Sequence, residues 1–171
     1  MLISLTIAVA AIVLDQLTKH WAQTSLQAVG DIPLWEGVFH FHYARNTGAA
    51  FSMLEGHNWF FFIFTVVVVA GMSWYLFRHR KGMHPLLQVA LGLIIGGALG
   101  NFIDRVSLGY VVDFLYFKLI NFAIFNVADS ALVVGCILMG IYILLIHERH
   151  TGQLKQPEEG AHGTGDDQPA G

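Results

Sequence analysis

The sequence predicts an all-α membrane protein, in which four transmembrane helices carry a small extracytoplasmic β-sheet between the first and second helices. Of its 171 residues, 55% are hydrophobic and only 12% are charged, whereas a soluble domain averages about 25% charged residues. Four apolar segments each approach the ~20 residues that a helix needs to cross a bilayer. We expect residues 1–150 to form a single membrane-embedded domain. Residues 151–171, rich in Gly, Pro, Gln and acids, are expected to form a disordered cytoplasmic tail.

The four expected spans cover residues 2–21, 59–77, 85–103 and 126–146. The first span could instead be a cleaved signal peptide, because residues 3–14 resemble an apolar h-region. No basic n-region precedes them, however, and the polar run DQLTK at 15–19 is unusual after an h-region. We therefore interpret this segment as a permanent transmembrane helix.

Basic residues indicate how the spans are oriented. Arg78, Arg80 and Lys81 crowd the turn between the second and third spans, and Arg149 and Lys155 follow the fourth. Because Lys and Arg concentrate in cytoplasmic loops, both termini are predicted to be cytoplasmic. The loops after the first and third spans then lie outside.

The first outer loop, residues 22–58, is too long for a simple turn and contains the sequence VFHFHYARNTGAAF. Its period-two alternation places His40 and His42 on one face of a strand, and Phe39 and Phe41 on the other. We expect a short sheet on the membrane surface, with the aromatic face toward lipid or the helices. The two histidines could be metal ligands, but no third ligand has a recognisable spacing. An exposed strand face without a metal is the expected arrangement.

Glycines in the third span recur every four residues. Gly92, Gly96 and Gly100 share one helical face with Asp104, because residues four apart lie nearly above one another in a helix. Such a stripe lets a second helix approach closely. It therefore predicts that Asp104 points into a helix contact.

With four spans, every acid before Glu148 falls on the outer side of the membrane. Ionisable groups near the bilayer usually face a bundle interior and mark a functional site. Arg105 could pair with Asp104 or Asp113, or extend to lipid headgroups. The polar residues expected to gather on this side are Asp15, Lys19, Asn46, Asn101, Asp104, Arg105, Asp113, Asn126 and Asp129.

Several of these residues also have purely structural explanations. Asp15 and Lys19 have the i, i+4 spacing of a helix ion pair, which is compatible with a supporting role in a site. Asn126 and Asp129 fit a capping box at the start of the fourth span. Asp113 could be an exposed loop acid, although the apolar neighbours in VVDF favour a desolvated position. None of these explanations accounts for the gathering on one side.

The residue types limit the chemistry of such a site. The sequence has no paired Ser and His and no phosphate-binding loop, and the single cysteine, Cys136, lies in an apolar run without a base at helical spacing. Carboxylates are the abundant group. Two aspartates about 3 Å apart share one proton, which allows aspartic-protease chemistry without a cofactor. Residue types alone leave open which two aspartates would pair.

Five blocks of the sequence, in this order and spacing, resemble those of the bacterial lipoprotein signal peptidases, also called type II signal peptidases. The blocks are DQLTK (15–19), NTGAAFS (46–52), GGALGNFIDR (96–105), VVDF (111–114) and FNVAD (125–129). The resemblance covers nearly everything between residues 2 and 147. Each block is weak alone, but five blocks in register with four spans are a specific signature.

The resemblance implies roles for individual residues. Asp113 and Asp129 would be the catalytic pair, and Asn46, Asn101 and Arg105 would line the site and contact substrate. The remaining motif residues expected to support the site or bind substrate are Asp15, Lys19, Gly48, Asp104 and Asn126. The connection 114–125 matches no fixed pattern, so its shape stays open.

The resemblance also implies an activity and a location. The protein would cleave signal peptides from diacylglyceryl-modified prolipoproteins, just before the lipidated cysteine, in the bacterial cytoplasmic (inner) membrane. Its active site would face the outer side, with prolipoproteins and membrane lipids as partners, and with no metal, cofactor or nucleic acid. A small proton-coupled transporter is the main alternative, because intramembrane acids also mark ion pathways. A scaffold that assembles through glycine faces is a second, but it gives no role to Asp113 and Asp129.

Overall fold

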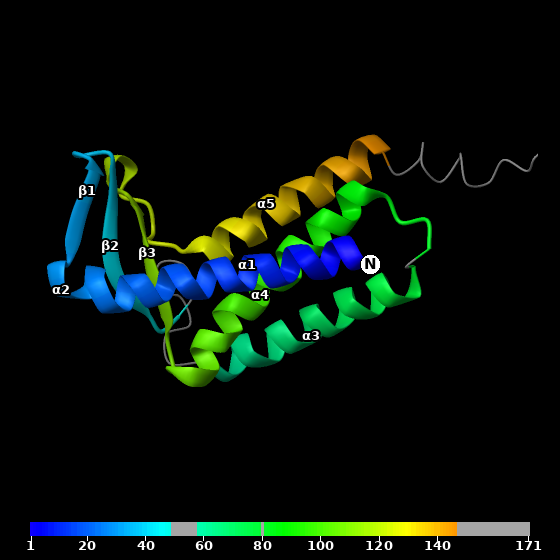
Figure 1. Ribbon diagram of the computed structural model, residues 1–171, viewed down its shortest axis with the longest axis horizontal. Helices are drawn as coiled ribbons and strands as arrows, with labels where there is room; N and C mark the ends of the chain where they lie inside the picture. The colour runs from blue at the N-terminus through cyan, green and yellow to red at the C-terminus, as the bar shows by residue number, and fades with distance from the viewer. Residues whose placement is uncertain (49–57, 80, 147–171) are drawn as a thin grey trace, which may run out of the picture.

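The computed structural model describes residues 1–48, 58–79 and 81–146 as a helical bundle with a small sheet at one end (Figure 1). The expected tail, 151–171, lies outside the described residues. The elements in chain order are α1 (Leu2–Trp21), η1 (Ala22–Leu26), α2 (Gln27–Val29), β1 (Asp31–Trp35), β2 (Phe39–Asn46), α3 (Asn58–Arg78), α4 (Pro85–Ser107), β3 (Val111–Phe117), η3 (Lys118–Ile120), α5 (Val127–Ile141) and η4 (Tyr142–Ile146).

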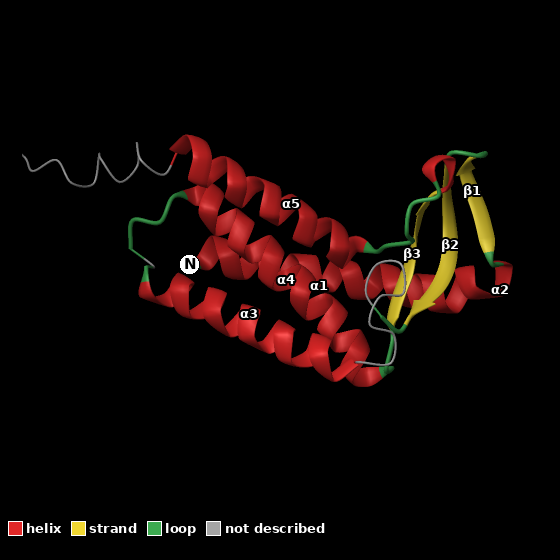
Figure 2. Ribbon diagram, turned by 180° about the vertical axis from the view of Figure 1, so that it is seen from behind, coloured by secondary structure: helices red, strands yellow, loops and turns green. Residues whose placement is uncertain are grey.

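Four helical stretches are long and apolar enough to cross a membrane, which confirms the predicted spans. They cover Leu2–Val29, Trp59–Arg78, Pro85–Ser107 and Val127–Ile146. Met1, the turn between α3 and α4, and the end of η4 all lie at the end of the bundle away from the sheet (Figures 1 and 2). With an even number of spans, the first span begins and the last span ends at the same end of the bundle.

Helix α4 is the centre of the bundle, because more than half of its apolar window is buried inside the protein, whereas none of the α3 window is. The predicted glycine stripe explains the contact with α1. A Cβ on Gly92 would lie 2.6 Å from the carbonyl oxygen of Ser4, and a Cβ on Gly96 would lie 2.8 Å from that of Ala8. Larger side chains would push the two helices apart. Most of the large apolar side chains of α3 are exposed, as in a helix whose solvent is lipid.

The sheet is antiparallel with strand order β1-β2-β3, and its strands run across the helix axes (Figure 2). Only β1 and β2 come from the loop between the first two spans. The third strand follows α4 and pairs with β2, so that Asn46 is opposite Val111 and Ala44 is opposite Asp113. The sheet predicted between the first two spans is therefore present, and a third strand from after α4 extends it. The connection that the sequence left open begins with a strand that completes the sheet.

The aromatic face of β2 packs against the end of the first helical stretch. Phe41 and Tyr43 lie against a buried cluster formed by Ala22, Leu26, Val112 and Phe114. This confirms that the aromatic face turns toward the helices. It also explains why the first helix continues past Trp21 to Val29, because its extra turns cover the sheet.

The opposite face of β2 differs from the expectation at one position. His40 is 1% exposed rather than solvent-facing. Its Nδ1 lies 2.8 Å from Asp31 Oδ2 across the hairpin, and its Nε2 accepts the backbone N–H of Gly37 at 3.2 Å. His42 is partly exposed and makes a longer contact of 3.3 Å with Asp31. Both histidines thus form side-chain contacts with Asp31 across the hairpin, and His40 also stabilises the β1–β2 turn through the backbone of Gly37.

Candidate active site

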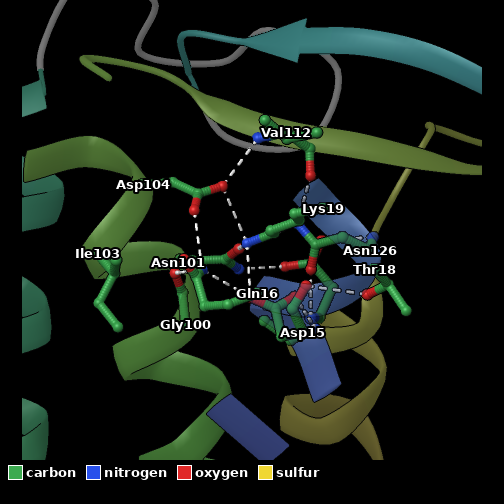
Figure 3. Close-up of polar contacts among 12 residues, drawn as sticks. Asp15, Gln16, Thr18, Lys19, Gly100, Asn101, Ile103, Asp104, Val112 and Asn126 are labelled. Atoms are coloured by element: carbon green, nitrogen blue, oxygen red, sulfur yellow. Dashed lines mark hydrogen bonds and ion pairs between the residues drawn. The ribbon is translucent and has the colours of Figure 1, made fainter. Parts of the chain in front are cut away.

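Polar side chains from α1, β2, α4, β3 and α5 meet where the sheet joins the bundle. Figure 3 shows the part around Lys19, where residues of α1 and α4 meet Val112 and Asn126. Six of the nine predicted residues are removed from solvent, with 0–7% of each residue exposed, whereas Asn46, Arg105 and Asp129 are partly exposed. The buried members are Asp15, Lys19, Asn101, Asp104, Asp113 and Asn126. The predicted convergence is therefore confirmed as a geometric fact.

Lys19 is the centre of a buried ion cluster (Figure 3). Its Nζ lies 2.9 Å from Asp15 Oδ2 and 3.0 Å from Asp104 Oδ2, and it donates to Asn101 Oδ1 at 2.9 Å. The i, i+4 pair that the sequence predicted is thus formed, and a second carboxylate and an amide complete it. Removing one partner from such a cluster leaves an uncompensated buried charge, which typically costs 3–5 kcal/mol.

The two carboxylates of the ion cluster also fix backbone segments of other elements. Asp104 Oδ2 accepts the N–H of Val112 at 3.0 Å, which attaches β3 to α4. Asp15 Oδ1 accepts the N–H of Ala128 at 2.9 Å, which attaches the first turn of α5 to α1. Asp15 and Asp104 therefore hold in place the two segments that carry the other aspartates.

Asn126 forms the N-cap of α5 and joins the aspartates together. Its backbone is extended, with φ −134° and ψ −175°, and its side chain accepts the N–H of Asp129 in a complete capping box. Its Nδ2 donates to Asp113 Oδ1 at 2.7 Å and to Asn101 Oδ1 at 2.9 Å, with Val112 O at 3.3 Å. The predicted capping box is confirmed, and the same side chain also reaches the site.

Asp113 lies on β3 and is 2% exposed, so the desolvated position that VVDF favours is confirmed. Its Oδ2 accepts from Asn46 Nδ2 at 2.9 Å, and its Oδ1 accepts from Asn126. Burial, followed by the negative charge of Asp129, raises the pKa of Asp113 from 3.8 to about 7. The two amide hydrogen bonds oppose this shift, because they stabilise the ionised carboxylate.

Asp129 lies in the first turn of α5 and receives donors from two sides. Its Oδ1 accepts from Asn101 Nδ2 at 2.7 Å, and its Oδ2 accepts the backbone N–H of Asn126 at 3.1 Å. Asn126 therefore donates to both Asp113 and Asp129. The pair consists of two neighbouring carboxylates that receive only N–H donors from the protein in the contacts described.

A pocket of about 690 Å³ opens beside this pair. Its wall is mostly apolar and is formed by α3, α4, α5 and residues 122–125, with a polar end formed by Asn46, Asn101, Arg105 and Asp129. Most ligand sites combine an apolar wall with a few polar groups that fix orientation in this way. The pocket therefore reaches one carboxylate of the pair, Asp129, and the asparagines that bind both carboxylates.

Arg105 lies at the polar end of the pocket. Its Nη2 donates to Gly48 O at 3.2 Å, and its guanidinium carbon lies 4.7 Å from the centre of the Phe61 ring. Its Nε is buried without a hydrogen-bond partner, and it forms no ion pair, as judged from residues 1–48, 58–79 and 81–146. Gly48 N–H in turn donates to Asn46 Oδ1 at 2.9 Å. Residues 49–52 of the NTGAAFS block lie outside the described part of the chain.

Gln16 is a supporting residue that was not among the predicted site residues. Its Nε2 donates to Asp104 Oδ1 at 2.9 Å and also lies 3.3 Å from Asp15 Oδ2 and from Gly100 O. A glutamine on an apolar helix has no distinctive spacing of its own. The available signal was its position inside the DQLTK block, next to Asp15.

These features define a class of protein: a multi-pass membrane protein with a carboxylate-rich site between its bundle and a surface sheet. The family model described as Signal peptidase (SPase) II matches residues 7–145. The chain is 43% identical over 152 residues to the lipoprotein signal peptidase of Symbiobacterium thermophilum, covering 88% of this chain and 99% of that relative. It is 45% identical over 141 residues to that of Bacillus subtilis, covering 81% and 91% respectively. The chain belongs to the signal peptidase II family.

A solved structure supports the same conclusion. The fold resembles that of a bacterial membrane enzyme determined by the in meso method, with a TM-score of 0.76, 37% identity, and coverage of 91% of this chain and 93% of that one. The protein is therefore a bacterial multi-pass membrane protein of a peptidase family. The alternative of a proton-coupled transporter receives no support from these relatives.

Proposed function

We propose that this protein is a membrane aspartic endopeptidase that removes signal peptides from diacylglyceryl-modified prolipoproteins, cleaving just before the lipidated cysteine. Membership of the signal peptidase II family supports the reaction. The relatives named lipoprotein signal peptidase, at 43–45% identity over most of the chain, support the substrate class.

The observation that carries the catalytic assignment is the pairing of Asp113 and Asp129 through one shared asparagine, Asn126. A pKa of about 7 at Asp113 means that the pair holds one proton near neutral pH, which is the working state of a carboxylate dyad. Asp15 and Asp104 are the competing candidates. Both are already engaged by Lys19 and by backbone N–H groups.

The reaction proceeds by general acid–base catalysis on a bound water. The ionised aspartate takes a proton as the water oxygen adds to the scissile carbonyl carbon, and the protonated aspartate donates to the carbonyl oxygen. The tetrahedral adduct then collapses: the aspartate that took the water proton passes it to the amine nitrogen as the C–N bond breaks. The other aspartate takes back a proton from the hydroxyl that it had protonated, so the new carboxyl group forms and the pair returns to its starting state. Asn46, Asn101 and Asn126 hold the two carboxylates without competing for the proton that they share.

The apolar pocket suits a substrate that arrives from within the membrane. Phe61, Phe64 and Val68 of α3 face Leu132 and Val133 of α5 across it, and these surfaces match an apolar signal-peptide segment or an acyl chain. Membrane anchoring of both partners also aligns the encounter. The Nε of Arg105, which has no hydrogen-bond partner among the described residues, is a donor for a substrate carbonyl or for a phosphate oxygen.

We infer an orientation in which the sheet and the site face the outer side of the membrane and both termini are cytoplasmic. Arg78 and Lys81 lie at the opposite end of the bundle from the sheet, where the positive-inside rule places cytoplasmic loops. The substrate's lipid would confine it to the outer interface, where the carboxylates are.

The test is cleavage of a purified diacylglyceryl-modified preprotein by Asp113→Asn and Asp129→Asn variants in detergent micelles. Each variant should lose about 10³-fold or more in kcat while keeping its fold, because neither can complete the proton exchange. Near-normal turnover by either folded variant would refute the assignment. Asp104→Asn is the control, and a loss equal to that of the pair, with the fold intact, would mean that the wrong carboxylates had been chosen.

A further inference from the structure

We propose that Lys19 is a positioning residue: its buried ammonium fixes the orientation of the Asn101 side-chain amide, and through it keeps N–H donors directed at Asp129 and Asp113. This inference rests on the proposed function, since it assigns Lys19 a part in preparing the same carboxylate pair. Lys19 itself contacts neither of the two carboxylates in the hydrogen bonds and ion pairs described.

The orientation of Asn101 follows from the chemistry of its neighbours. An ammonium has three donors and no acceptor, so the group 2.9 Å from Lys19 Nζ must be the amide oxygen. The same oxygen accepts from Asn126 Nδ2 at 2.9 Å, and the amide nitrogen then faces Asp129 Oδ1 at 2.7 Å. The reversed amide would set N–H groups against the ammonium and against Asn126, and an oxygen against a carboxylate.

The constraint passes from Asn101 to the next amide. Because Asn101 presents its oxygen, Asn126 must present its nitrogen to that oxygen, and the same nitrogen reaches Asp113 Oδ1. Asn126 Oδ1 is left to accept the N–H of Asp129. One lysine thereby determines two amide orientations, and the two carboxylates receive donors on the sides where these amides meet them.

Donors and a nearby positive charge both favour the ionised form of a carboxylate. The charge of Lys19 and the hydrogen bond from Asn126 each lower the pKa of Asp113 against the larger effect of burial. Lys19 therefore helps to set the pH at which the pair loses its second proton. The charged groups that face this region are Asp15 and Lys19 on α1, Asp104 and Arg105 on α4, Asp113 on β3 and Asp129 on α5.

The test is a charge-balanced double variant, Lys19→Met with Asp104→Asn, which removes one charge of each sign and keeps the net charge of the cluster, although Asp15 loses its ion pair. Carbon-13 NMR of labelled aspartate side chains in micelles follows the titration of Asp113 without any substrate. The midpoint should move upward by about one pH unit, a tenfold change in proton affinity. The alkaline limb of the kcat profile on lipidated preprotein should move in the same direction, because loss of the second proton ends the singly protonated working state.

Two control variants separate positioning from general support. Asp104→Asn alone removes a negative charge. It should therefore raise neither the NMR titration midpoint of Asp113 nor the corresponding midpoint of the kcat profile. Gln16→Met breaks hydrogen bonds of the same ion cluster but leaves the Lys19–Asn101 contact, so it should lower stability without moving the titration. An unshifted midpoint in the double variant, or an equal shift in Gln16→Met, would overturn the inference.

If the double variant does not fold, Asn101→Leu gives the same answer with Lys19 and every charge of the site intact. It removes the amide that links Lys19 to Asp129 and Asn126 and adds no charge that would itself raise the midpoint. The Asp113 midpoint should again rise, and an unchanged midpoint would contradict the inference. The NMR titration decides the role of Lys19 even for a protein that cleaves nothing, whereas failure of the wild type to cleave lipidated preprotein would refute the proposed function alone.

Discussion

The side-chain amide of Asn126 donates to Asp113 Oδ1 at 2.7 Å, although one residue is a helix cap and the other is part of a strand. The same asparagine accepts the backbone N–H of Asp129 at 2.9 Å. A single side chain therefore begins α5 and sets the position of β3 relative to it. Its two tasks use different atoms, Oδ1 for the cap and Nδ2 for the strand, and substitutions can separate them.

Asn126→Ser should keep the helix cap but lose the donor to Asp113, because a serine oxygen still accepts the N–H of Asp129. Its thermal stability should fall less than that of Asn126→Ala, which also loses the cap, worth about 1 kcal/mol. Both variants should lose activity on lipidated preprotein to a similar extent. Unfolding in detergent and kcat measured on the same samples check this. Full activity in the serine variant would contradict a role for the Asn126–Asp113 bond.

Asp113→Asn should stabilise the protein above neutral pH. The pKa of Asp113 is raised to about 7 by burial and by the charge of Asp129, so its contribution to stability is present below about pH 4 and is lost as the pH rises through 7. Each unit of pKa difference corresponds to about 1.4 kcal/mol. We expect a gain on the order of 1–2 kcal/mol at pH 8, reduced because one amide hydrogen would face a donor.

Thermal unfolding of both proteins at pH 5 and pH 8 measures this gain, which should be larger at pH 8. Asp31→Asn is a control of opposite sign. The hydrogen bond from His40 lowers the pKa of Asp31, so its contribution is present above about pH 4 and is lost on acidification. Equal gains for Asp113→Asn at the two pH values would contradict the buried, charge-coupled state of that carboxylate.

Gly100→Ala should be strongly destabilising. The added Cβ would lie 2.6 Å from Asp15 Oδ2 and 3.1 Å from the Ala128 side chain, so it would displace the carboxylate that holds the start of α5. Overpacking of this kind costs about 1–3 kcal/mol. Gly140→Ala is the matched control, because no described heavy atom outside its own stretch of helix lies within 4 Å of its added Cβ. Alanine favours a helix over glycine by up to about 1 kcal/mol, so equal losses in the two variants would contradict this account.

His40→Leu should loosen the β1–β2 hairpin, since the buried ring joins Asp31 to the backbone of Gly37. Loss of these hydrogen bonds should cost about 1–2 kcal/mol of local stability. Hydrogen exchange of residues 31–42 measures the opening directly. His42→Leu should have a much smaller effect, because that ring is 44% exposed and its contact is 3.3 Å. Equal exchange rates in the two variants would contradict the proposal that the hydrogen bonds of His40 stabilise the hairpin.

The sequence predicts most of the bundle because lipid imposes simple requirements. Apolar lengths locate the spans, and glycine spacing locates the face of α4 that a second helix approaches, which the structure identifies as α1. The third strand escaped prediction for two physical reasons. Val111–Phe117 is almost continuously buried at its start, without alternation, so its pattern does not distinguish strand from other buried chain. Its partner strand also lies more than 60 residues earlier.

The site was predicted as a set of residues but not as a network. Resemblance supplied Asp113 and Asp129, and the one-sided gathering of acids supplied the location. Which amide faces which carboxylate depends on contacts between distant segments, such as Lys19 with Asn101, and no local pattern encodes them. His40 shows the same limit at shorter range, because its burial depends on Asp31 in the neighbouring strand.

The bond between Ala128 N–H and Asp15 Oδ1 joins residues 113 positions apart, which has a consequence for biosynthesis. When α1 enters the membrane during translation, the residues that later surround Asp15 have not been made. Lys19, one turn away, supplies a counter-charge from within the same helix, so the first span can insert as a neutral unit. The carboxylate pair can assemble only after the start of α5 emerges from the ribosome, and shorter nascent chains are expected to be inert.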